Sequence, residues 1–127
     1  MDIMDELAQT PVQRKTYFVQ AENAFLRNSA YTSNEIRVFL ILCTYAGVKA
    51  HCFPGQNGIA KHMGISRNRV NQILKDLEKK NGVFILNTKG INNSNGNNIY
   101  FLAEIDKHTG FFIPESLSEY KRKYNNF

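Results

Sequence analysis

Apolar residues recur every three or four positions through the middle of the chain, as in a helix with one buried face. In the first such segment they are Ile36, Phe39, Leu40, Cys43 and Ala46. Thr32 or Ser33 can cap the start of this helix, and Gly47 is a natural end. Later the pattern changes, and residues 83–89 and 98–105 are rich in β-branched and aromatic side chains. The pattern therefore predicts helices followed by two strands.

The segment 56–75 has the pattern of two short helices joined by a tight turn. Its inward positions are apolar: Ile59, Met63, Ile65, Val70 and Ile73. Ala60 is small enough to let a second helix cross closely, and Gly64 suits a turn that requires a positive φ. Ser66 is placed to cap the second helix. Together these positions predict a helix-turn-helix.

The outward side of the second helix carries side chains rich in hydrogen-bond donors. They are Arg67, Asn68, Arg69, Asn71, Gln72 and Lys75. Arg67 and Arg69 are candidates for bidentate contact with guanine, and Asn71 and Gln72 for contact with adenine. Phosphate contacts are expected from Lys61, Lys75 and Lys89. A helical hairpin inside an unrelated core has no reason to expose such a face. We therefore expect this helix to lie in the major groove of DNA.

A polar loop separates the two predicted strands, which is the layout of a winged helix. The loop includes Asn92, Asn93 and Asn95, with Lys89 at its base. Two interpretations remain open. The asparagines could bond to phosphate, sugar and minor-groove acceptors, or they could serve turn geometry alone. In the first case the wing, and not the second helix, could make the main contact with DNA. The expected fold class is mainly α with a small antiparallel β-sheet, a winged helix-turn-helix.

Three parts of the chain follow from this pattern. Residues 1–16 form a polar N-terminal arm, residues 17–106 the winged helix-turn-helix domain, and residues 107–127 a C-terminal extension with a short helix over 116–124. Residues 17–20 have strand character, and residues 48–55 are expected as a loop anchored by Phe53. Three roles are open for the C-terminal helix. It could pack on the protein's own core, form a homodimer through Tyr120 and Tyr124, or contact the DNA backbone.

Charge narrows the choice of partner. The net charge of +5 favours an acidic partner such as nucleic acid. Between residues 61 and 89, seven Lys or Arg face two Asp or Glu, so this stretch alone carries +5. No Gly-rich phosphate loop or nucleophile paired with a base is present, and an enzyme is not expected.

Histidine and cysteine usage gives no metal or redox motif. His51, Cys52, His62 and His108 match no recurring zinc spacing, so neither a metal nor another cofactor is expected. Cys43 and Cys52 form no C-x-x-C pair. No segment has the length or apolarity of a signal peptide or a membrane span, and a reducing cytoplasmic location is expected.

Three stretches together resemble a known family: YFVQAENAFL, SNEIRVFLILCTYAG and HCFPGQNGIAKHMGISRNRVNQILKDLEKKNGV. They are similar to the N-terminal winged-helix domain of replication initiator and replisome-organiser proteins of plasmids, phages and integrative elements in low-GC Gram-positive bacteria. The resemblance implies sequence-specific binding of double-stranded DNA at an origin, with replication proteins as partners. Initiators usually carry a further domain after the wing, and here a short segment follows. An accessory protein at an origin of transfer beside a relaxase, a small transcriptional regulator and a protein-binding winged helix therefore stay open.

Overall fold

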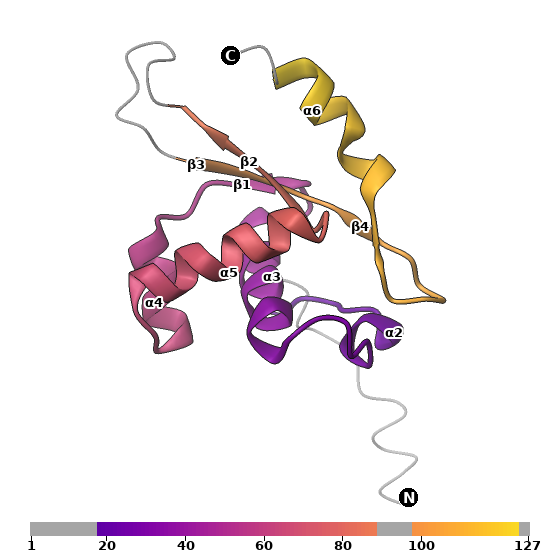
Figure 1. The fold of residues 1–127 in the computed structure, drawn as a ribbon, viewed down its shortest axis with the longest axis horizontal. Coiled ribbons are helices and arrows are strands. Elements are labelled where there is room, and N and C mark those ends of the chain that lie inside the picture. The colour runs from indigo at the N-terminus through magenta and orange to yellow at the C-terminus, as the bar shows by residue number, and fades with distance from the viewer. Residues whose placement is uncertain (1–17, 89–97, 125–127) are drawn as a thin grey trace, which may run out of the picture.

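The computed structural model describes residues 18–88 and 98–124, in which most helices precede most of the short strands and a last helical segment follows them. The helices are α2 (Asn23–Leu26), α3 (Ser33–Ala46), α4 (Gln56–Met63), α5 (Arg67–Lys79) and α6 (Ser118–Tyr124), with the 3₁₀ helix η1 (Pro114–Leu117) directly before α6. The strands are β1 (His51–Cys52), β2 (Val83–Asn87), β3 (Asn98–Leu102), β4 (Glu104–Ile105) and β5 (Phe112–Ile113). Figure 1 shows α4 on one side of the molecule, α5 running across its middle and α6 on the opposite side.

A three-stranded antiparallel sheet lies behind the helix-turn-helix, in the order β1-β3-β2. Val83 pairs with Leu102 and Asn87 with Asn98, so β2 and β3 form the hairpin of a wing. The mainly helical fold with a small antiparallel sheet confirms the predicted winged helix-turn-helix. The predicted second strand ends earlier than expected, at Leu102, and β4 pairs instead with β5.

Two local predictions around this sheet are wrong. Residues 48–55 are not only a loop, because His51 and Cys52 pair with Phe101 and Tyr100 to form β1. A strand of two residues is too short to show an alternating pattern in the sequence. It forms because these residues can pair with β3. In contrast, residues 18–20 belong to neither described sheet, although they were predicted as part of a strand. Strand character without a neighbouring strand is not enough to form one.

The sheet is covered on both faces (Figure 1). Tyr100 is fully buried on the side of α3 and α5, whereas the next residue, Phe101, points to the opposite face. There the rings of Tyr120 and Tyr124 stack on Phe101, with centroids 4.5 and 5.5 Å away. Of the three roles open for the C-terminal helix, packing on the protein's own domain is therefore the one observed. Phe84 of β2 stacks on Phe101 as well.

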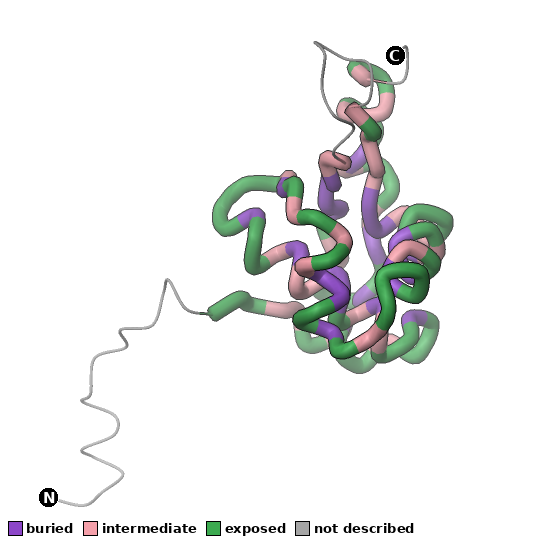
Figure 2. Tube along the Cα trace, turned by 90° about the vertical axis from the view of Figure 1, so that its left-hand side faces the viewer, coloured by how far each residue is buried: buried purple, intermediate pink, exposed green. Residues whose placement is uncertain are grey.

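Helix α3 is the core helix, and its start is as predicted. Thr32 accepts a hydrogen bond from the Glu35 backbone N–H, and the Glu35 carboxylate accepts one from the Thr32 N–H, which makes a capping box. The buried face differs from the expected stripe. Val38 and Leu42 are fully buried, while Ile36, Leu40 and Cys43 are only half-buried. Apolar residues surround much of this helix, so the direction from which α5 and the sheet approach decides which of them are buried. Figure 2 shows the buried residues gathered between the helices and the sheet.

An ion pair joins the start of α3 to the end of α5. The Lys80 ammonium lies 2.7 Å from a Glu35 carboxylate oxygen, and Glu35 is only 3% exposed. Lys80 also donates to the Ala30 carbonyl at 3.2 Å. Since a buried carboxylate needs partners, this contact fixes the C-terminal end of α5 against the core helix.

The segment after the sheet is tied to the N-terminal part of the domain. Asn28 donates its side-chain amide to the Gly110 carbonyl at 3.1 Å, and the Phe112 N–H donates to the Tyr31 hydroxyl at 3.0 Å. Phe112 and Leu117 are buried in the same core as Phe25 and the helices. The C-terminal residues therefore complete the hydrophobic core.

Candidate nucleic-acid interface

The turn between α4 and α5 has the geometry that the sequence predicted. Gly64 adopts φ 70° and ψ 29°, the left-handed conformation in which a Cβ is unfavourable. The Ser66 hydroxyl accepts a hydrogen bond from the Arg69 N–H at 3.1 Å and so caps α5. Ile59 and Val70 are fully buried between the two helices. The start of α5 is thus held by local bonds and by packing.

The predicted reading face of α5 turns to solvent. Its exposed members are Arg67, Asn68, Arg69, Gln72 and Lys75. Asn71 is half-buried against α4, and Lys61 of α4 is exposed. Lys89, Asn92, Asn93 and Asn95 of the wing loop lie outside the described residues. In Figure 1 the N-terminal half of α5 and the hairpin of β2 and β3 are directed to the same side of the molecule, which is the arrangement needed to contact one duplex.

Gln56, the first residue of α4, joins this face and was not predicted from the sequence. Its side-chain amide donates to Asn71 Oδ1 at 3.3 Å, and its amide oxygen accepts from Arg67 Nε at 3.4 Å. Because the second bond engages Nε, a bidentate contact of Arg67 with guanine would use the two terminal nitrogens. The only signal in the sequence was a side chain able to donate and accept at the first position of the motif.

Farther along α5, Gln72 has a different partner. Its side-chain amide donates to Asp76 Oδ1 at 3.1 Å, one helical turn away. A bidentate contact of Gln72 with adenine would have to replace this bond, because it uses the same amide group. The Asp76 carboxylate also repels phosphate. The N-terminal half of α5 is therefore the better placed half for contact with DNA.

Two side chains of α3 hold α4 in position. Arg37 donates to the His62 carbonyl at 3.0 Å, near the C-terminal end of α4 where carbonyl groups lack helical partners. The Tyr45 hydroxyl lies 2.8 Å from His62 Nε2. These two contacts fix the position of α4 and, through Gln56, that of the first turn of α5.

The charged side chains of this region are almost all positive. From Ile36 to Lys75 the chain contains no Asp or Glu, and it contains six Lys or Arg. That stretch spans most of α3, all of α4 and the first nine residues of α5. The region therefore carries a positive field that attracts a polyanion.

Neither cysteine offers a reactive thiolate near neutral pH. Burial raises the pKa of the Cys43 thiol to about 11, with a smaller contribution from the charge of Glu22. Burial also raises the pKa of the Cys52 thiol to about 12, with a contribution from Cys43. Within residues 18–88 and 98–124, no group of three or more His, Cys, Asp or Glu could hold a metal ion.

Comparison with known proteins agrees with this geometry. Residues 32–81 match a family model described as helix-turn-helix domain, a range that covers α3 through α5. No curated protein and no solved structure shows a significant match to the chain. The helix-turn-helix domain suggests DNA as the partner. No helix in the described part of the chain is long and apolar enough to cross a membrane.

Proposed function

We propose that this protein binds double-stranded DNA in a sequence-specific manner at an origin of a plasmid, phage or conjugative element, where it acts in replication initiation or its control. The observation that carries the proposal is the capped first turn of α5, which presents Arg67 and Arg69 to solvent within a stretch free of carboxylates. The resemblance to initiator domains supports the origin as the place of action. The proposal includes no catalytic step.

In the proposed mode, the N-terminal half of α5 enters the major groove. Arg67, Arg69 and Asn71 then lie nearest the bases, and two or three side chains read base edges. Lys61 and Lys75 contact phosphates on either side, since a positive charge on an exposed side chain adds affinity without reading sequence. A single helix reads only a few base pairs, so specificity would come from a dimer or from repeated sites.

A homodimer through α6 would have limited aromatic surface to use. Tyr120 and Tyr124 each have one ring face on Phe101 and are half-buried. Repeated sites occupied by single molecules therefore fit the geometry at least as well.

The test is selection of bound fragments from the replicon that carries the gene, followed by affinity measurements on the recovered site. The Arg67→Ala/Arg69→Ala variant should lower affinity for that site at least about 30-fold, because each base contact contributes about 1–3 kcal/mol of discrimination. The control is Arg27→Ala/Lys107→Ala, which removes the same charge from two exposed positions outside α4 and α5. Equal effects of the two double variants would mean that α5 does not read the site.

The position of the recovered site decides the process. A replication origin supports initiation or its control. An origin of transfer would favour the alternative of an accessory protein acting beside a relaxase, and a promoter would favour a small regulator. Recovery of fragments in proportion to their length would refute sequence-specific readout and would favour a winged helix that binds a protein.

A further inference from the structure

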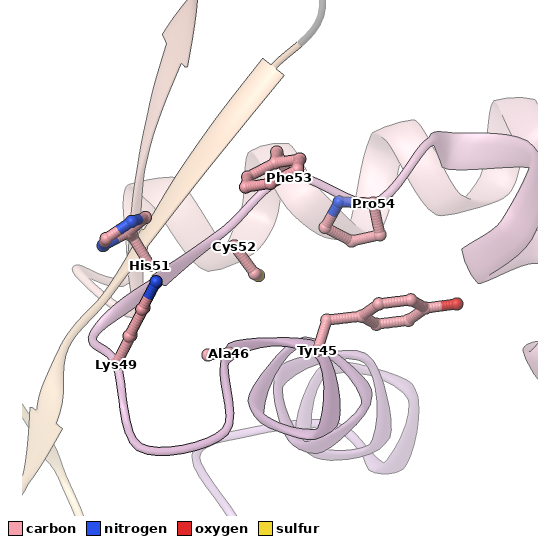
Figure 3. Close-up of a pocket in the computed structure, with 7 residues that line it drawn as sticks. All are labelled: Tyr45, Ala46, Lys49, His51, Cys52, Phe53 and Pro54. Carbon is pink, nitrogen blue, oxygen red and sulfur yellow. The ribbon is translucent and has the colours of Figure 1, made fainter.

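A hollow of about 430 Å³ lies between the end of α3 and the segment that follows β1. Figure 3 shows Tyr45 on one side, Pro54 and Phe53 on the other, and Lys49 and His51 toward one end. Phe53 was expected to anchor its loop in the core, but this is wrong, since its side chain is 71% exposed. Tyr45 is 47% exposed. Two large rings thus remain in water beside an open hollow.

The chemistry of the lining is aromatic and cationic. Tyr45, His51 and Phe53 supply rings, and Lys49 supplies a positive charge. Within the described part of the chain, no carboxylate lines the hollow. Rings interleaved with cations bind single-stranded nucleic acid, because every base has a face that can stack and every linkage has a charged phosphate.

The hollow is continuous with the candidate duplex interface. Pro54 is followed by Gly55, the N-cap of α4, and then by Gln56, which bonds to Arg67 of the reading helix. On the other side, the Tyr45 hydroxyl is held by His62 of α4. A strand that leaves the reading helix toward β1 would therefore meet these rings first.

We propose that this hollow binds an unpaired nucleotide of single-stranded DNA, with the base against Tyr45 and Phe53 and the phosphate against Lys49. Paired bases are stacked on their neighbours and their faces are covered, so an intact duplex cannot use the site. The protein would then contact duplex through α5 and an adjacent opened strand through the hollow. This activity differs from readout of duplex sequence and does not depend on it.

The test compares binding of a fluorescent oligothymidine with binding of a duplex, using the full chain and fluorescence anisotropy. Phe53→Ala should weaken oligothymidine binding at least about fivefold, which corresponds to the lower limit for one stacked base. It should leave duplex binding unchanged. The control is Phe111→Ala, which removes another exposed ring at 49% exposure on a segment that does not line the hollow. Phe53→Ala does not threaten the core, because the Phe53 ring is largely in solvent. The Phe111 ring is about half exposed and contacts Tyr31 edge-on, so the folded state of Phe111→Ala is checked by its urea denaturation.

Two further variants separate the phosphate contact of Lys49 from the binding of duplex by α5. Lys49→Ala should reduce the slope of log affinity against log salt by about 0.7, the value for one phosphate contact with a single strand. The Arg67→Ala/Arg69→Ala variant should lose duplex readout yet keep its sensitivity to Phe53→Ala, so this proposal can fail or succeed separately from the proposed function.

The proposal is overturned if the oligothymidine does not bind, or if Phe53→Ala and Phe111→Ala bind it equally well. If the hollow instead docks an acidic segment of a protein partner, Phe53→Ala and Phe111→Ala should likewise bind the oligothymidine equally well.

Discussion

Replacement of Lys80 by Ala tests how the C-terminal end of α5 is held against α3. Lys80 and Thr32 are the two groups that donate to Glu35, at 2.7 and 2.8 Å, and Glu35 is almost completely buried. Removing one partner of a buried ion pair costs about 3–5 kcal/mol when both partners are buried. The Lys80 side chain is 37% exposed, so water can replace part of the lost contact. We therefore expect Lys80→Ala to lower the free energy of unfolding by about 1.5–3 kcal/mol.

Urea denaturation of the natural protein and the variant measures this difference. The matched control is Lys79→Ala, the exposed neighbour in sequence, which should change the free energy of unfolding by less than about 0.5 kcal/mol. Adding Glu35→Gln to Lys80→Ala should restore part of the loss, because the unpaired buried charge is then gone. If Lys80→Ala and Lys79→Ala have the same small effect, the reasoning that the ion pair holds α5 against α3 is refuted.

Two glycines should respond to alanine with opposite signs in the same urea assay. Gly110→Ala should destabilise by about 1–3 kcal/mol, because φ is +76° and a Cβ would collide with the Ala24 carbonyl. Gly58→Ala should stabilise by about 0.5–1 kcal/mol, because the position is inside α4 and a Cβ there makes only an ordinary contact. At pH 8 a disulfide reagent should modify Cys43 about 100-fold more slowly in the folded protein than in urea, since the pKa rises from 9.0 to about 11. Cys52, with a pKa of about 12, should be slower still, and rapid modification of either folded thiol would contradict the burial seen here.

Where bonds are local, sequence patterns located the parts of the fold correctly. Thr32 and Ser66 cap their helices as expected, and Gly64 takes the left-handed turn. These features depend on residues three or four positions apart, so a sequence contains all of the interacting groups. The outward face with Arg67 and Arg69 followed from the same helical spacing.

Contacts between distant segments were decided only by the tertiary structure. The bonds of Gln56 to Arg67 and Asn71 join residues 11 and 15 positions apart, and β1 forms only because β3 lies beside it. Phe53 is an ordinary core residue by type, yet it remains in solvent because the sheet and α3 leave a hollow at that point. The sequence by itself determined the capped helices, their turn and the side chains on the outward face of α5. Tertiary packing decided which apolar faces are buried, because burial depends on the direction from which the other elements approach.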